Sequence, residues 1–261
     1  FSSNVSGTWQ IYTVEVLTGT IRQITFSSGN KYSPSWSADS STIVFSGDAS
    51  GNRDLYVIPS DGSELPTPIT QTPDDETQPA WAPAGGAGIA PILFTRSTAG
   101  AGSRIYRIGP DGQNEQLVTN GGGDPLANDT DPAWRHNAQL IAFASDRLVD
   151  GADLNPDYNI WTVASAGEEV TDATHRSNLD PQDTYDDRYP TFNPGLNPRE
   201  PIRIFFTSSR PDGDGAEPDI WRFELNDPVP PELVDLPSVD AERRLVAPGG
   251  DVTIHVEVFD R

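Results

Sequence analysis

Aspartate and glutamate are the residues of this sequence with the most chemistry to offer. The chain holds 39 of them against 17 lysines and arginines, which gives a formal net charge of −22. Carboxylate and amide oxygens are the ligands that hard cations such as Ca²⁺ prefer, and two aspartate-rich segments cluster them. The candidate calcium ligands are Asp150, Asp153, Asn155, Asp157, Asp212 and Asp214. Neither segment has the EF-hand spacing, so solvated acidic turns are the alternative interpretation.

Catalytic motifs are not indicated anywhere in the chain. There is no Gly-x-Ser-x-Gly elbow and no His-Glu-x-x-His helix. The three histidines, His136, His175 and His255, stand in unrelated contexts, and cysteine is absent as a nucleophile or metal ligand. The sequence therefore predicts no catalytic residue, no enzymatic activity of its own, and calcium as the one candidate cofactor.

The charge and the hydropathy exclude two classes of partner. Binding to DNA, RNA or an anionic membrane needs basic patches, and an acidic chain with a single lysine, Lys31, repels polyanions. No apolar stretch approaches the roughly 18 residues of a membrane span. We expect neither a nucleic-acid partner nor membrane insertion. A solvated surface is the plain reason for the acidity.

The elements that must position these acids form an internal repeat with a period of about 40–60 residues. A unit starts with Pro-x-Trp or Pro-x-Phe, continues with two short apolar runs, and closes with an Asp-Gly turn and a threonine in its clearest copies. The Pro-x-aromatic motifs end at Trp36, Trp81, Trp134 and Phe192. The apolar runs are four to six residues long, as in short strands, and 23 glycines and 24 prolines disfavour long helices.

Four strands in a unit of this length describe a blade of a β-propeller, and the pattern resembles the blades of TolB and its relatives. Residues 26–70 match best; 71–119 and 120–175 are further complete units, and 176–236 is less regular. The matching residues in the best copy are Trp36, Asp39, Phe45, Asp54, Tyr56, Asp61, Gly62 and Thr70. We expect an all-β fold, four complete or near-complete blades plus a partial one, from a ring of six to eight. The aromatic rings should fill the space between adjacent sheets.

Three regions follow from this pattern. Residues 1–225 are the propeller blades, the first one starting inside a repeat, and residues 226–238 are a proline-rich linker or a last edge strand. Residues 239–261 contain an alternating strand after Gly249-Gly250, which resembles the start of an immunoglobulin-like module. That C-terminal strand could instead complete the sheet of a neighbouring subunit.

Antiparallel strands sort the loops onto two faces. Within a blade, the connections from strand two to three and from strand four to the next blade lie on one face, which we call the inter-blade face. The connections from strand one to two and from strand three to four lie on the opposite face, which we call the hairpin face. Long loops on a rigid scaffold usually carry binding function, and most acids fall on the inter-blade face. The predicted binding residues are Asp74, Asp75, Glu76, Asp129, Asp131, Asp183, Asp186 and Asp187.

The sequence predicts a non-enzymatic propeller that binds a protein partner or a neighbouring subunit within a larger surface or secreted protein. An extracytoplasmic location is what the resemblance to TolB implies. One alternative is the substrate-gating propeller of a secreted serine-peptidase-type hydrolase. Another is an accessory domain of an extracellular multihaem redox or adhesion protein. The sequence leaves these alternatives open.

Overall fold

The computed structural model describes residues 1–84, 91–121, 124–147, 157–165, 170–172, 185–193, 201–209, 219–225 and 232–233. Strands β1 to β19 form five antiparallel sheets in sequence order, with no strand exchanged between sheets. The predicted all-β fold of four-stranded blades is confirmed. The predicted modules after residue 233 lie outside the described residues.

The strands are short, and all but the first sheet have four of them. The first sheet holds β1 (Ser2–Ser3), β2 (Gln10–Val14) and β3 (Ile21–Gln23). The second holds β4 (Lys31–Trp36), β5 (Thr42–Gly47), β6 (Asp54–Pro59) and β7 (Thr67–Pro68). The third holds β8 (Asp75–Trp81), β9 (Ile92–Ser97), β10 (Ser103–Ile108) and β11 (Gln116–Leu117). The fourth holds β12 (Asp129–Trp134), β13 (Leu140–Ser145), β14 (Asn159–Ala164) and β15 (Val170–Asp172). The fifth holds β16 (Asp187–Phe192), β17 (Arg203–Ser208), β18 (Asp219–Glu224) and β19 (Glu232–Leu233).

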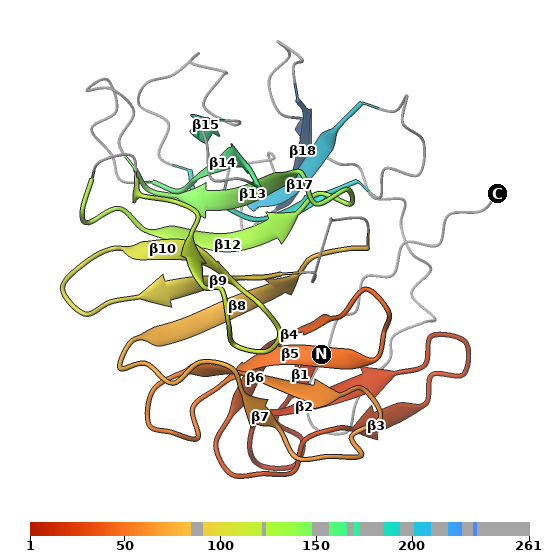
Figure 1. The fold of residues 1–261 in the computed structure, drawn as a ribbon. Coiled ribbons are helices and arrows are strands. Elements are labelled where there is room, and N and C mark those ends of the chain that lie inside the picture. Colours follow the sequence, from red (N-terminus) through yellow and green to blue (C-terminus); the bar gives the residue numbers. More distant parts are fainter. Residues whose placement is uncertain are drawn as a thin grey trace.

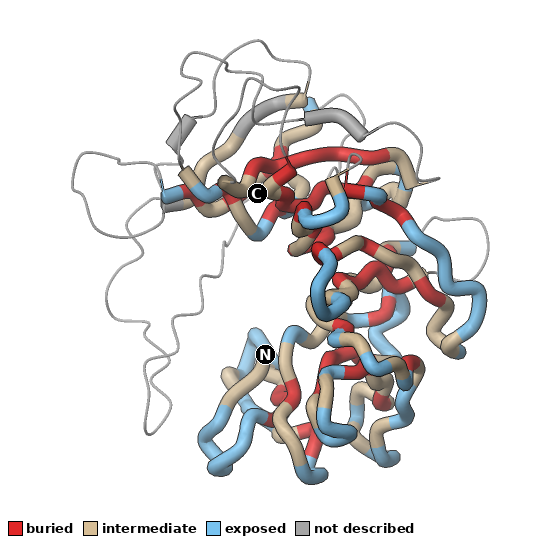
Figure 2. The backbone as a smooth tube through the Cα atoms, turned by 90° about the vertical axis from the view of Figure 1, so that its left-hand side faces the viewer, coloured by how far each residue is buried: buried red, intermediate tan, exposed pale blue. Residues whose placement is uncertain are grey.

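The sheets stack side by side (Figure 1) and follow one another along an arc (Figure 2). The first strands of neighbouring four-stranded sheets contact each other, β4 with β8, β8 with β12 and β12 with β16. Those strands therefore lie where the wedge-shaped sheets converge, on the inner side of the arc. The outer strands β7 and β11 are two residues long, which leaves little exposed edge for unwanted pairing.

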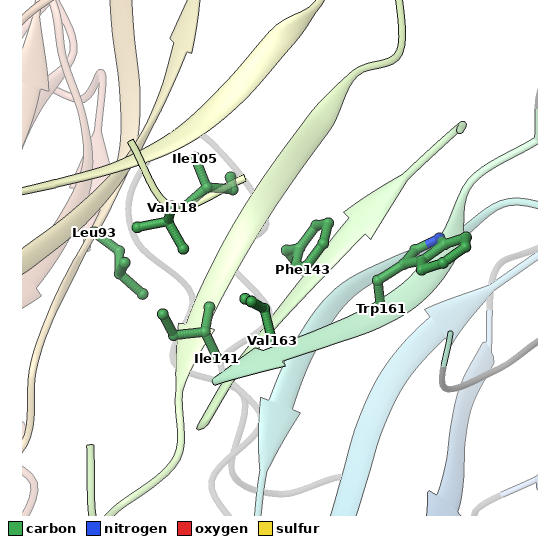
Figure 3. Packing of buried hydrophobic residues seen from close by; sticks show 7 residues of the cluster. All are labelled: Leu93, Ile105, Val118, Ile141, Phe143, Trp161 and Val163. Carbon is green, nitrogen blue, oxygen red and sulfur yellow. The ribbon is translucent and has the colours of Figure 1, made fainter. Parts of the chain in front are cut away.

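Apolar side chains between adjacent sheets form the core. Figure 3 shows one such layer, in which Leu93, Ile105 and Val118 of the third sheet meet the fourth. The fourth sheet contributes buried Ile141, Phe143, Trp161 and Val163. A strand buried on both faces has no polar face to alternate with, which is why the sequence shows continuous apolar runs.

Three of the four predicted inter-sheet rings pack as expected. Trp81, Trp134 and Phe192 each lie against a buried cluster shared with the preceding sheet. Trp36 differs, because 47% of its surface is exposed. Trp81 packs on Val44, which lies in β5 of the preceding sheet. In the first sheet, the two-residue strand β1 takes the place of β5, so no equivalent side chain covers Trp36.

The threonine that closes a repeat has a structural function. Buried Thr70 accepts a hydrogen bond from the backbone N–H of Leu55 at 2.8 Å, and so joins the chain after the fourth strand to the third strand. Thr25 and Thr119 accept the equivalent bonds from Ile11 and Ile105. The motif therefore ends in threonine because a buried N–H needs an acceptor at that point.

We expect Thr70→Val to destabilise the chain by about 1–3 kcal/mol, because valine keeps the shape but leaves the Leu55 N–H buried without an acceptor. Urea unfolding followed by tryptophan fluorescence measures the difference. Thr67→Val is the matched control, since Thr67 is exposed in β7 and its side chain makes no hydrogen bond to the described residues. Equal stabilities for the two variants would contradict this account.

Candidate functional site

The inter-blade face is held together by one hydrogen bond that recurs at four junctions. At each junction, the residue just before or at the start of a sheet's first strand accepts a backbone N–H from the preceding sheet. The donor lies just before or at the start of β2, β6, β10 or β14. The donors Trp9, Arg53, Ser103 and Tyr158 lie 3.2, 2.8, 3.2 and 3.1 Å from the side-chain oxygens of Asn30, Asp75, Asn128 and Asp186, respectively. We call these four acceptors the junction staples.

Two of the staples are braced from within their own sheet. Asn30 donates both its backbone N–H and its side-chain amide to Asp48, and Asn128 donates the same pair of groups to Asp146. Hydrogen bonding to Asn30 lowers the pKa of Asp48 against the opposing effect of burial. The aspartate after the second strand is therefore a structural acceptor as well as a surface charge.

The residue after each staple is buried, and in two sheets an arginine pairs with its charge. Glu76 is fully buried and its Oε1 accepts from Nε of Arg96 at 2.9 Å. Asp129 is fully buried and pairs with Arg147, whose guanidinium also lies over the rings of Phe143 and Trp161. The Asp129–Arg147 pair is almost fully buried, so water screens it little, whereas Arg96 also reaches the more exposed Glu115.

Lys31 follows the staple Asn30, as Glu76 and Asp129 follow theirs, but it carries a positive charge. Its ammonium donates to the carbonyls of Ser27, Ser28 and Gly29, and Lys31 is only 2% exposed. Burial lowers the pKa of Lys31, and the nearby Asp48 acts in the opposite direction. At this position the fold accepts either charge, provided that partners surround it.

The inner side of the arc presents a strained residue from each of four sheets. Each first strand has a β-bulge next to its proline, and the residue before that proline has a positive φ. Ser33, Gln78, Asp131 and Tyr189 have φ values of 52, 53, 54 and 55°. We call these four residues the inner rim. A residue before proline normally prefers extended backbone, so this conformation is held by the surrounding sheets.

Hydrogen bonds connect the rim residues from one sheet to the next. Gln78 donates its amide to Oδ1 of Asp131 and accepts the Asp131 backbone N–H at 3.2 Å. The Asp131 carboxylate in turn accepts the backbone N–H of Tyr189. Asp131 is 7% exposed, and burial is the main cause that raises its pKa. The rim is thus one connected polar chain across three sheets.

A cation and a tyrosine ring extend this chain. The guanidinium of Arg188 lies 3.7 Å from Oδ2 of Asp131 and stacks over the Tyr158 ring at 3.4 Å from its centroid. Burial raises the pKa of the Tyr158 hydroxyl. Tyr189 itself is 62% exposed and Ser33 is exposed, so the rim ends in accessible side chains.

The predicted binding residues fall into different environments. Glu76, Asp129 and Asp187 are fully buried, Asp75 and Asp186 are staples, and Asp131 belongs to the rim. Asp74 is half-buried and accepts a hydrogen bond from Thr98. Asp183 lies outside the described residues. Three of these acids, Asp75, Asp131 and Asp186, therefore join neighbouring sheets, which does not test whether the face binds a ligand.

Of the candidate calcium ligands, only Asp157 is described, and it is half-buried. Asp150, Asp153, Asn155, Asp212 and Asp214 lie outside the described residues, so calcium binding stays a prediction. Among the described residues, no group of three or more His, Cys, Asp or Glu side chains could hold a metal ion. No helix of the length and apolarity of a membrane span occurs in that part of the chain.

The sequence analysis missed Gln78, Arg188 and Tyr189 as candidate functional residues. For Gln78 and Tyr189, the available signal was their position directly before the proline of a Pro-x-aromatic motif. Residue type changes there from serine to glutamine, aspartate and tyrosine, whereas the proline does not change. Variation at one position of an otherwise repeated unit marks a residue that the fold does not specify.

Comparison with known proteins agrees with this architecture. Residues 1–126 match the family model for the TolB beta propeller domain. The fold is that of a TolB-like β-propeller. The chain superposes on a protein assigned as TolB from Agrobacterium tumefaciens with a TM-score of 0.63 and 18% identity, over 85% of this chain and 72% of that one.

Solved structures of differently named proteins also superpose on the chain. TolB from Acinetobacter baumannii gives a TM-score of 0.60 at 17% identity, and the match covers 84% of this chain and 47% of that one. Hydrazine synthase of Kuenenia stuttgartiensis gives 0.67 at 14% identity, over 86% and 35% of the two chains. At these identities the likeness establishes the fold alone, and the chain spans less than half of the latter two proteins.

Replacing the arginine of the buried Asp129–Arg147 pair by a neutral residue should lower the free energy of unfolding. We expect Arg147→Met to destabilise the propeller by about 3–5 kcal/mol, because it leaves the Asp129 carboxylate buried without its charged partner. The double variant Asp129→Asn with Arg147→Met should regain part of that loss. Urea unfolding of the two variants gives the comparison, and a double variant less stable than Arg147→Met would contradict the pairing.

The raised pKa of Asp131 predicts a pH dependence of stability. The protonated carboxyl is favoured in the fold, so its contribution is present below pH ~4 and is lost as the pH rises through the raised pKa. Relative to wild type, Asp131→Asn should therefore become progressively more stable between pH ~4 and 7. Asp61→Asn is the control: turn hydrogen bonds lower the pKa of Asp61, so its effect should be flat over this range. A flat difference for Asp131→Asn, measured by urea unfolding, would contradict the prediction.

Proposed function

We propose that this chain is a non-enzymatic propeller module that binds a protein partner along its inner rim. The observation that carries the proposal is the contrast between repeated and variable positions within the chain. Staples, prolines and closing threonines recur from sheet to sheet because the fold needs them. The rim positions share one backbone conformation and present four different side chains.

The rim has the properties of a recognition surface. Its backbone is held in a sparsely populated conformation by neighbouring sheets, and such strain tends to occur at functional sites. Tyr189 offers an exposed aromatic ring, a residue type enriched in binding hot spots. The stacked Arg188, whose side chain is 30% exposed, adds a positive charge beside it, and the buried Asp131 carboxylate holds that arginine in place. A rigid, chemically mixed strip of this kind suits a peptide segment of a partner protein.

The setting we propose is extracytoplasmic, as part of a larger surface or secreted protein. The match of residues 1–126 to the TolB beta propeller domain supports it. The net charge of −22 disfavours a nucleic-acid partner. The partner would be another protein or a neighbouring subunit. Calcium on the acidic loops stays part of the proposal as a candidate ligand.

The rim proposal predicts the effect of one side chain. We expect Tyr189→Ala to weaken partner binding by about 30-fold, the loss typical of a hot-spot aromatic. The partner is first captured on immobilised wild-type chain from an extract of the cells that produce it. Its affinity for purified variants is then measured by calorimetry.

Leu65→Ala is the matched control, since Leu65 is 81% exposed on the hairpin face and should leave the affinity unchanged. Equal affinities for all three proteins would place binding elsewhere than on the rim. Turnover of chromogenic peptide or ester substrates by the purified chain would contradict the non-enzymatic proposal and favour the hydrolase alternative.

A further inference from the structure

A pocket of about 430 Å³ lies on the hairpin face, opposite the loops that carry the staples. Its walls come from two neighbouring sheets. Ala38, Asp39 and Thr42 belong to the β4–β5 hairpin, Val57 to β6, Trp81 to β8, and Pro110 to the β10–β11 turn. We call it the Trp81 pocket. Its volume is at the small end of the range for ligand sites and is sufficient for a long side chain.

Asp39 supplies a fixed negative charge at this pocket. Its Oδ1 accepts three hydrogen bonds from residues of the same turn, at 2.6 Å from the Ser37 hydroxyl and 3.0 and 2.8 Å from the N–H and hydroxyl of Ser41. The Ser37 bond is the largest of the causes that lower the pKa of Asp39 to about 2. Asp39 is exposed, and no described lysine, arginine or histidine forms an ion pair with it.

Trp81 differs from its counterpart in the next sheet. The indole N–H of Trp134 donates to the carbonyl of Ala80 at 3.1 Å. The Trp81 indole N–H makes no hydrogen bond to the described residues, whereas its backbone N–H donates to the Ser35 hydroxyl oxygen at 3.0 Å. The half-buried ring packs on the cluster of Val44, Leu55 and Phe94. It therefore offers both an aromatic surface and a donor without a protein partner in that part of the chain.

We propose that the Trp81 pocket binds a lysine or arginine side chain of a peptide segment, with the charged group at Asp39 and the methylene stem along Trp81, Val57 and Pro110. Long basic side chains bury their stems on apolar surface while the charged end stays at an anion. A guanidinium or ammonium is also attracted by the face of an indole ring. The Trp81 indole N–H is a donor for a main-chain carbonyl of the same segment.

Charge favours this occupant over an acidic or neutral one. The chain carries a formal net charge of −22, so it attracts basic segments over a distance and repels acidic ones. The site goes beyond the rim proposal, because it lies on the hairpin face, away from the rim on the inner side of the arc, and uses other residues. Loss of one site should leave the other intact.

The test is an NMR titration of the ¹⁵N-labelled 261-residue chain. The probe is acetyl-Gly-Arg-Gly-amide, and acetyl-Gly-citrulline-Gly-amide is its uncharged match. Of the six tryptophans, the indole signal of Trp81 is identified by its loss in Trp81→Phe. We expect the arginine peptide to shift this signal saturably, and the citrulline peptide to bind at least about tenfold more weakly, as the loss of a charge-assisted hydrogen bond implies.

Asp39→Asn should weaken binding of the arginine peptide about tenfold, because asparagine can still accept the turn hydrogen bonds but carries no charge. Asp61→Asn, an exposed turn carboxylate on the same face, should leave binding unchanged. Equal shifts from the two peptides, or equal weakening by the two substitutions, would overturn the proposal. A saturable shift confined to another indole signal would also overturn it. Binding of the rim partner to Asp39→Asn at wild-type affinity would show that the two sites are separate.

Discussion

The junction staple is the interaction on which the rest of this structure depends. A sheet with two apolar faces is not stable alone, and burial between sheets is non-directional, so packing does not by itself fix how one sheet meets the next. A side-chain oxygen that accepts an N–H from the preceding sheet supplies that direction at four successive junctions. The buried charge that follows each staple then requires its own partners, which Arg96 and Arg147 provide in two sheets.

This dependence gives the acidic loops a structural role beside any role in binding. Asparagine and aspartate concentrate where the chain passes between sheets, because short side chains with oxygen acceptors are needed there. The same composition would serve a cation site or a binding loop. Only the positions of Asp75 and Asp186 against N–H groups of the preceding sheet show that they join sheets. These two aspartates therefore join neighbouring sheets as well as contributing negative charge.

The repeat made the fold predictable from the sequence, since proline, aromatic and apolar runs return in one order and each has a local physical reason. The candidate sites were less predictable. The rim depends on a backbone angle before each proline, and a preference for extended backbone at such residues would have predicted the opposite. The Trp81 pocket depends on a turn after β10 lying beside a hairpin after β4, some 70 residues earlier. Neither the rim conformation nor the pocket can be recognised from a short stretch of the sequence.

Lys31 gives the protein an unusual chemical surface. It is the only lysine of the chain, and three backbone carbonyls enclose its ammonium. Amine-directed electrophiles and acyl-transferring enzymes therefore meet no exposed lysine among these blades while the first junction is closed. Covalent labelling of the Lys31 ammonium nitrogen would therefore report the opening of the first junction between sheets, independently of the other three junctions.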